Sequence, residues 1–268
     1  MKENNIQNIK FTVITVCYNS EKTIQRTLQS IKDQTYKNIE YIIIDGGSTD
    51  RTLEIINQYS DIVNILVSEP DNGIYDAMNK GIRLATGDYI GFLNSDDYYA
   101  NNIFEEYSIA LISENYDFIY SNTAYIFDMY SNASFYKAPK YKSKKFFKIM
   151  KRHIPFCHQS LYVSRKTFQK LKWFNLKYQI SADYDFFLRM MMIDDVEGFY
   201  LDKNLCYFRL GGVSGRNFFN TNKEHAIVRI NNGMNFFVSY WHLIRFFVHF
   251  LIVKSKVYIL LKKYIIKK

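Results

Sequence analysis

Short runs of β-branched and aliphatic residues alternate with longer segments of helical period along the first 121 residues. The runs predict strands over Phe11–Val16, Ile39–Ile44, Val63–Ser68, Tyr89–Leu93 and Asp117–Ser121. Apolar residues at spacings of three and four predict helices over Thr23–Gln34, Thr52–Tyr59 and Ala77–Ala85. This alternation is typical of βαβ units, which build an α/β fold with a mostly parallel sheet flanked by helices.

Polar residues follow four of these strands. They are Tyr18–Ser20, Asp45–Asp50, Glu69–Gly73 and Asn94–Asp97. In open parallel sheets, ligands bind at the carboxyl ends of the strands. The sequence therefore predicts one polar site at that edge of the sheet.

The residues at the strand ends argue against two common kinds of nucleotide-binding site and favour a divalent-cation site. No G-x-G-x-x-G follows the first strand, and G-x-x-x-x-G-K-[ST] occurs nowhere, which argues against dinucleotide oxidoreductases and P-loop proteins. Asp96 and Asp97, preceded by Asn94, offer oxygen ligands to a hard divalent cation that completes its shell with phosphates. An Asp pair alone also suits a solvated turn, but its position beside three other polar strand ends favours the site.

Composition and cysteine usage indicate a globular protein from a reducing compartment. The 268 residues are 48% hydrophobic and 23% charged, enough to bury a full core without disulfides or a structural metal. Cys17, Cys157 and Cys206 are odd in number and contain no C-x-x-C, which argues against a disulfide framework and a zinc finger.

Charge is unevenly distributed along the chain. Residues 1–100 carry 9 basic and 14 acidic side chains, whereas residues 101–268 carry 26 and 12. Eight basic residues and no acidic one lie between Lys137 and Arg152. Basic segments rich in aromatic and aliphatic residues suit an anionic membrane surface. Nucleic acid is disfavoured because no nucleic-acid-binding motif accompanies the charge.

Seven segments, in chain order, resemble family 2 glycosyltransferases with the GT-A fold, in particular the bacterial branch that builds surface polysaccharides. The matching segments are Val13–Asn19, Gln34–Tyr36, Tyr41–Asp50, Glu69–Gly81, Thr86–Asp97, Pro155–Ser160 and Ala182–Arg189. The resemblance spans about residues 10–215. It implies a Rossmann-like GT-A domain over residues 1–215. For residues 216–268 the pattern of the chain itself predicts C-terminal amphipathic helices that associate with a membrane or pack on protein.

The resemblance also implies roles for individual residues. Implied contacts to a nucleotide-sugar are Val16, Tyr18, Asn19, Asp45, Tyr75, Asp76, Asn79, Asn94, Ser95, Asp96 and His158. Asp96 and Asp97 correspond to the aspartates that bind metal and diphosphate, and Asp183 corresponds to the catalytic base. Two positions depart from the family pattern: Gly46 stands where an aspartate is frequent, and Asn94 replaces the first aspartate of the metal motif.

The chemistry of sugar transfer agrees with this allocation. Displacing a nucleoside diphosphate needs a cation on the leaving group and a base that takes the proton of the acceptor hydroxyl. One base with direct in-line attack inverts the anomeric configuration. Residues two apart on a helix do not share a face, so only one of Asp183 and Asp185 can point at the acceptor, and the resemblance favours Asp183. Arg189 binds either a phosphate or Asp185 at i−4.

The C-terminal segment combines apolar residues with a cationic stripe. The stripe consists of His242, Arg245, His249, Lys256, Lys263 and Lys267. This pattern favours an interfacial helix on anionic lipid; the alternative is a helix packed on the enzyme or on a second copy in a homodimer. Charges interrupt the apolar run Phe236–Ile266 before it reaches the length of a spanning helix.

Together these observations predict an inverting glycosyltransferase of the hexosyltransferase type that uses Mg²⁺ or Mn²⁺. We expect it to act in the cytoplasm, peripherally on the inner face of a bacterial plasma membrane, moving a sugar from a UDP-sugar to a lipid-linked glycan of O-antigen (lipopolysaccharide) or capsule. The alternatives are a metal-dependent nucleotidyltransferase on a related α/β core and a non-catalytic sugar-nucleotide-binding module. The retained Asp96, Asp97 and Asp183 favour the transferase.

Overall fold

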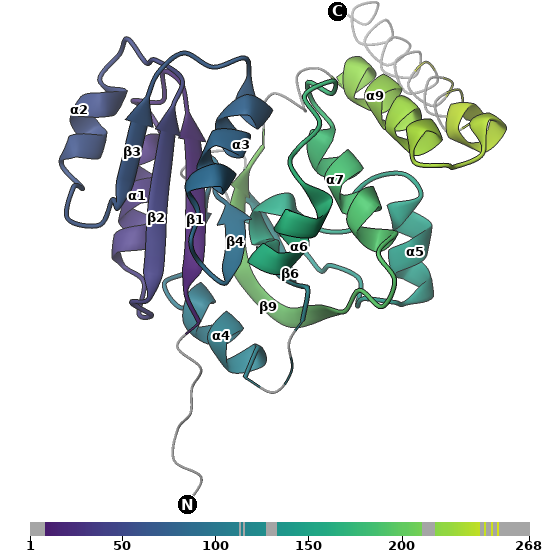
Figure 1. The fold of residues 1–268 in the computed structure, drawn as a ribbon, viewed down its shortest axis with the longest axis horizontal. Helices are drawn as coiled ribbons and strands as arrows, with labels where there is room; N and C mark the ends of the chain where they lie inside the picture. Colours follow the sequence, from purple (N-terminus) through teal and green to yellow (C-terminus); the bar gives the residue numbers. More distant parts are fainter. Residues whose placement is uncertain are drawn as a thin grey trace, which may run out of the picture.

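The computed structural model describes residues 9–112, 114, 116–126, 133–210, 218–241, 244, 248 and 251. Within these residues one nine-stranded sheet runs through the molecule (Figure 1). The strands are β1 (Phe11–Cys17), β2 (Ile39–Asp45), β3 (Ile65–Ser68), β4 (Tyr89–Phe92), β5 (Tyr98–Tyr99), β6 (Phe118–Ile126), β7 (Ser134–Tyr136), β8 (Tyr162–Ser164) and β9 (Gly198–Arg209). The helices are α1 (Ile24–Lys32), α2 (Thr52–Asn57), α3 (Ile74–Leu84), α4 (Ile103–Ala110), α5 (Lys144–Met150), the 3₁₀ helix η1 (His158–Ser160), α6 (Arg165–Leu171), α7 (Ala182–Met191) and α9 (Phe218–Asn231).

The first half of the sheet is parallel, in the order β3-β2-β1-β4. Every residue of β1 is buried, because alternate side chains enter two hydrophobic cores on opposite faces. Helices α1, α2 and α4 cover one face, and α3, α6 and α7 cover the other. The predicted α/β class and its parallel strands are confirmed, and the helices predicted over residues 23–34, 52–59 and 77–85 correspond to α1, α2 and α3.

The second half of the sheet is mixed. Strand β8 runs antiparallel to both β4 and β6, while β6 and β9 form a long parallel pair with register shifts around Asn122. Short strands β5 and β7 add antiparallel to β9 and β6. Stacked and edge-on aromatic rings fill the space between this half and α5 to α7, among them Tyr120 against Phe156 with ring centroids 4.1 Å apart.

The described part of the C-terminal segment packs on this half. Helix α9 lies beside α7 and near α5 (Figure 1). The Arg229 guanidinium is buried and donates to the carbonyl oxygens of Arg152 (2.9 Å) and Ser239 (3.1 Å), which joins α9 to the end of α5 and to the helical residues 236–241. Among the described residues, no helix combines the length and the apolar character needed to span a bilayer. The predicted cationic stripe lies outside the described residues.

Candidate active site

A cleft of about 1400 Å³ opens at the carboxyl ends of the parallel strands. Segments 16–23, 71–74 and 94–96, which follow β1, β3 and β4, form what we call the strand-end wall. Segments 153–158 and 179–184, together with Thr221 and His225 of α9, form the helical wall. The position of the cleft confirms the expectation from the polar strand ends.

Most of the residues singled out from the sequence line this cleft. These are Val16, Tyr18, Asn19, Tyr75, Asn94, Ser95, Asp96, His158 and Asp183. Asp45, Asp76, Asn79, Asp97 and Asp185 are not among the lining residues. Their side chains bond within the protein instead.

Asp45 ends β2 and organises the loop behind the strand-end wall. Its carboxylate is fully buried and accepts hydrogen bonds from the backbone N–H groups of Gly47 (3.1 Å) and Ser48 (2.9 Å) and from the Ser68 hydroxyl (2.7 Å). The Ser48 hydroxyl also donates to it. Ser48 and Thr49 in turn bond Asn19 in the loop after β1, so Asp45 sets the shape of both loops.

Gly46 stands where an aspartate is frequent in the family that the chain resembles. A carboxylate from another strand end occupies this place. A Cβ placed on Gly46 would lie 2.5 Å from Asp71 Oδ2, so Asp71 fills the space that a side chain at position 46 would need. Asp71 lines the cleft and accepts from the Gly73 backbone N–H at 2.8 Å. Asp71 was not singled out from the sequence, in which Gly46 was noted only as a departure from the family pattern.

Asn79 and Asp76 shape the start of α3 and its neighbour. Asn79 is buried and makes two hydrogen bonds to the backbone of Phe174, donating to its carbonyl (3.0 Å) and accepting from its N–H (2.9 Å). Phe174 packs on Tyr75 and lines the cleft. Asp76 accepts from the Asn72 backbone N–H at 3.0 Å, so its carboxylate holds the loop before α3 instead of lining the cleft.

The turn 94–97 carries the oxygen atoms that fit a divalent cation. Among the described residues, no group of three or more His, Cys, Asp or Glu side chains is arranged to hold a metal ion. Asn94 Oδ1 is buried without a hydrogen-bond partner among those residues, and Asn94 and Asp96 both line the cleft. A cation that takes one or two protein oxygens and completes its shell with phosphates fits this donor set.

Asp97 lies behind the same turn. Its Oδ1 accepts from the Arg209 backbone N–H at 2.8 Å, which ties the turn to the end of β9. Burial, reinforced by the charge of Asp96, raises the pKa of Asp97 well above its ordinary value. The geometry thus gives Asp97 a role in holding the turn.

Asp183 begins α7 with its carboxylate facing the cleft. Its Oδ1 accepts from the Tyr75 hydroxyl (3.0 Å) and from the Tyr184 backbone N–H (2.8 Å). Burial, followed by the charge of Asp183, raises the pKa of Tyr75 well above its ordinary value, so the phenol remains a donor. Asp183 Oδ2 lies 3.7 Å from His158 Nδ1.

His158 and Gln159 connect the two walls. His158 Nε2 and Gln159 Nε2 are 3.0 Å apart, and Gln159 Oε1 accepts from the Asn94 backbone N–H at 3.0 Å. The turn that carries Asn94 and the carboxylate of Asp183 are therefore joined through two side chains of η1.

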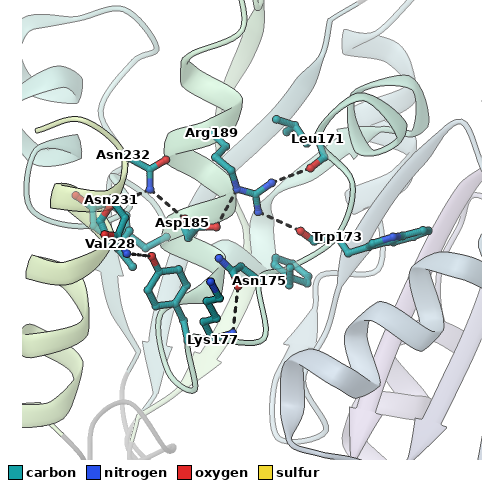
Figure 2. A network of polar contacts seen from close by, with 12 residues as sticks. Leu171, Trp173, Asn175, Lys177, Asp185, Arg189, Val228, Asn231 and Asn232 are labelled. Carbon is teal, nitrogen blue, oxygen red and sulfur yellow. Dashed lines mark hydrogen bonds and ion pairs between the residues drawn. The ribbon is translucent and has the colours of Figure 1, made fainter.

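Asp185 points away from the cleft into a structural network (Figure 2). It pairs with Arg189 Nε at 2.8 Å and accepts from Asn232 Nδ2 at 3.0 Å. Arg189 also donates to the carbonyl oxygens of Leu171 (2.8 Å) and Trp173 (3.1 Å). The pair expected between Asp185 and Arg189 at i, i+4 is confirmed.

Sequence comparisons identify relatives of the chain. The family model described as "Glycosyl transferase family 2" matches residues 12–172. The chain is 32% identical over 188 residues to the "PGL/p-HBAD biosynthesis glycosyltransferase" of Mycobacterium tuberculosis (strain ATCC 25177 / H37Ra), covering 67% of this chain and 68% of the relative. It is 30% identical over 206 residues to an "Uncharacterized glycosyltransferase" of Haemophilus influenzae, covering 76% and 80%.

Solved structures share the fold. S. aureus TarS 1–349 in complex with UDP matches with a TM-score of 0.65 and 22% identity, over 86% of this chain and 68% of TarS 1–349. The mannosyltransferase PcManGT from Pyrobaculum calidifontis, in complex with GDP-Man and Mn²⁺, matches with a TM-score of 0.63 and 16% identity, over 88% and 70%. The chain therefore shares its fold with these two proteins.

Proposed function

The chain belongs to glycosyl transferase family 2 and has the GT-A fold, and from that premise we propose that it is an inverting transferase that moves a sugar from a UDP-sugar to a lipid-linked glycan. The observation that carries the proposal is the placement of Asp183 on one wall and of Asn94 and Asp96 on the other wall of the same cleft. Such a cleft holds a leaving diphosphate on one side and an acceptor hydroxyl with its base on the other.

The strand-end wall binds the nucleotide in this proposal. Tyr18 is 63% exposed at the cleft and offers a ring on which a base stacks. Asp71 supplies the carboxylate toward the base, while Asp45 and Asn79 support the surrounding loops. TarS is solved with UDP and with UDP-GlcNAc, which supports a uridine donor, and PcManGT is solved with GDP-Man.

The residues that would hold the divalent cation, Mg²⁺ or Mn²⁺, are Asn94 and Asp96, with Asp97 fixing the turn behind them. When bound, the cation neutralises charge that develops on the departing diphosphate. PcManGT, solved with Mn²⁺, supports this part of the proposal.

Asp183 acts as the base. Its carboxylate takes the proton of the acceptor hydroxyl as that oxygen bonds to the anomeric carbon and the bond to the donor phosphate breaks. The nucleoside diphosphate leaves from the opposite side, so the anomeric configuration inverts. Tyr75 and the Tyr184 N–H hold Oδ1, which leaves Oδ2 to face the acceptor.

The elements behind the helical wall carry a basic and an apolar surface. Exposed lysines of the α5 region include Lys144, Lys145, Lys148 and Lys151. Exposed apolar side chains follow α9, namely Phe236, Phe237, Val238, Trp241 and Ile244. Arg229 joins the two groups through its bonds to Arg152 and Ser239. Cationic and apolar side chains beside the cleft suit an anionic lipid surface, which supports a lipid-linked acceptor of O-antigen or capsule assembly and a peripheral location on the cytoplasmic face of the membrane.

A nucleotide-release assay tests this proposal. Purified protein with Mn²⁺ or Mg²⁺ is given UDP-, GDP- and dTDP-sugars, with and without a polyprenyl-diphosphate-linked sugar. We expect acceptor-stimulated UDP release that falls about 10²–10⁴-fold in Asp183→Asn and about 10²-fold in Asp96→Ala. Asp61→Asn, at an exposed pair with Lys32, is the matched control and should retain full activity. Release of GDP would overturn the uridine assignment, and full activity of Asp183→Asn would overturn the role of the base.

Vesicle sedimentation tests the membrane part separately. The protein should co-sediment with phosphatidylglycerol vesicles, and less so above 0.5 M salt or after Trp241→Ser. Failure to sediment, together with a dimeric mass in light scattering, would assign the apolar face to a second copy of the chain instead.

A further inference from the structure

Glu224 of α9 accepts three consecutive backbone hydrogen bonds from the loop that leads into α7. The donors are the N–H groups of Gln179 (3.1 Å), Ile180 (2.9 Å) and Ser181 (3.0 Å). Ser181 is the N-cap of α7 and makes no side-chain capping bond of its own. The carboxylate of Glu224 therefore satisfies the amides immediately before the helix that carries Asp183.

The same loop is held from the opposite side by α3. The Tyr75 hydroxyl lies 2.8 Å from the Ile180 carbonyl oxygen and 3.0 Å from Asp183 Oδ1. Ile180 is thus held at its N–H by Glu224 and at its carbonyl by Tyr75. Two helices that are far apart in the sequence fix the backbone three residues before the base.

Helix α9 also forms part of the cleft on this side. Thr221 and His225, which lie three residues before and one residue after Glu224, line the helical wall. The His225 ring packs on Tyr184, the residue whose N–H bonds Asp183, with ring centroids 4.8 Å apart. The contacts of α9 therefore converge on the residues around Asp183.

We propose that Glu224 is a positioning residue for Asp183, and that α9 belongs to the catalytic unit rather than to an appended segment that starts at residue 216. This inference rests on the proposed role of Asp183 as the base. Glu224 touches neither donor nor acceptor in this arrangement. It acts by fixing the direction in which the Asp183 carboxylate enters the cleft.

The experiment compares Glu224→Ala and Glu224→Gln with a control, Glu106→Ala. Glu106 lies on the distant helix α4, and its carboxylate pairs with Lys203 of β9. We expect kcat of Glu224→Ala to fall about 10–100-fold with the donor KM unchanged, because misplacement of a reacting group slows chemistry without removing donor contacts. Glu224→Gln keeps one acceptor oxygen for the loop and should recover most of the loss. Glu106→Ala should match the unsubstituted protein.

A second substitution separates positioning from mere support of the fold. In the Asp183→Asn background, Glu224→Ala should cost no further activity, since residues that act as one unit are not additive. An equal multiplicative loss in both backgrounds, or a donor KM that rises together with the fall in kcat, would overturn the proposal. So would an unchanged kcat in Glu224→Ala.

Amide hydrogen exchange gives a readout that does not depend on turnover. The amides of residues 179–181 should be protected in the unsubstituted protein and exchange faster in Glu224→Ala. If that variant fails to fold, the Gln179 amide, which has one carboxylate oxygen to itself, should exchange faster in Glu224→Gln. Unchanged exchange would overturn the anchoring by Glu224. If the unsubstituted protein transfers no sugar while these amides respond as expected, the proposed function fails and the anchor stands.

Discussion

The two walls of the cleft are held in place by different kinds of bond. The strand-end wall follows from the register of parallel strands: Cys17 and Asp45 are direct neighbours, and the Gly46 N–H continues the ladder to the Cys17 carbonyl at 2.9 Å. The helical wall has no such ladder. Side chains from separate elements, Tyr75 and Glu224, bond to its backbone, and Arg229 holds the residue just before it, Arg152.

Because of this difference, single substitutions should disturb the two walls to different extents. A parallel register is set by many small contributions, so single substitutions within it are partly absorbed. A loop held by a few buried charged groups loses much of its definition when one of them is removed, because the remaining partners are left unsatisfied. The helical wall should therefore be the more sensitive of the two.

The largest effect is expected from Arg189→Ala, in the polar network behind the helical wall. The substitution leaves the Asp185 carboxylate, whose side chain is 5% exposed, with Asn232 as its partner among the contacts drawn in Figure 2, and it removes the donors to Leu171 and Trp173. Loss of one partner of a buried pair costs about 3–5 kcal/mol. Urea unfolding measures it, with Arg51→Ala at an exposed pair as the control that should leave the midpoint unchanged.

A smaller loss of stability is expected from Gly91→Ala in β4, on the parallel side. A Cβ at this position would lie 2.5 Å from the Tyr162 ring, which is fully buried and edge-on to Phe11 and Phe104. Overpacking of this kind costs about 1–3 kcal/mol. The same urea experiment tests it, with Ile90→Val on the same strand as a mild reference at about 1 kcal/mol. A cost above that of Arg189→Ala would break the comparison between the walls.

The sequence predicted the parallel half of the fold far better than the mixed half. Strands β1, β2 and β4 carry continuous buried runs because both faces of the sheet are covered there. The longest strand, β9, was not predicted, since Asp202–Asn204 interrupt it with exposed polar residues and its pairing with β6 shifts register at Asn122. A segment with neither a continuous apolar run nor regular alternation gives no local signal for a strand.

The site shows the same division. The strand ends were predicted from their polar residues, and Asp183 was identified by family resemblance. Glu224 could not be found in this way, because its partners lie 43 to 45 residues away in the chain and nothing around it marks the contact. Asp71 was missed for a related reason: its nearness to Gly46 depends on how the loops after β2 and β3 fold against each other.

Asp71→Asn, on the strand-end wall, should weaken donor binding without slowing the transfer step. Removal of one charge-assisted hydrogen bond to a base weakens binding about 10-fold, so the KM for a UDP-sugar should rise by that factor at constant kcat. Donor titrations and initial rates measure the two quantities. Because Asp71 also accepts from the Gly73 N–H, Asp71→Ser, which retains an acceptor oxygen there, controls for the loop. A fall in kcat at constant KM would place Asp71 with the base rather than with the donor.

The smallest predicted effect is the change in the free energy of unfolding at acidic pH. A residue of the helical wall and a residue behind the strand-end wall contribute to it with opposite sign. Burial, then the charges of Arg229 and His153, lowers the pKa of His225 to about 3. Below pH 6.5 the unfolded chain binds a proton at His225 that the folded protein does not, so this residue costs stability as the pH falls from 6.5 toward 3. Asp97, whose pKa is raised, contributes stability in acid that is lost as the pH rises.

Comparing variants isolates the contribution of His225, because that of Asp97 is common to both proteins. Between pH 6.5 and 5.5 the unsubstituted protein should lose about 1 kcal/mol relative to His225→Gln, in which the titrating ring is absent. Urea unfolding at three pH values across this range measures the difference in slope. Parallel slopes for the two proteins would mean that His225 takes up a proton in the folded state, and hence that the helical wall admits water where α9 packs on Tyr184.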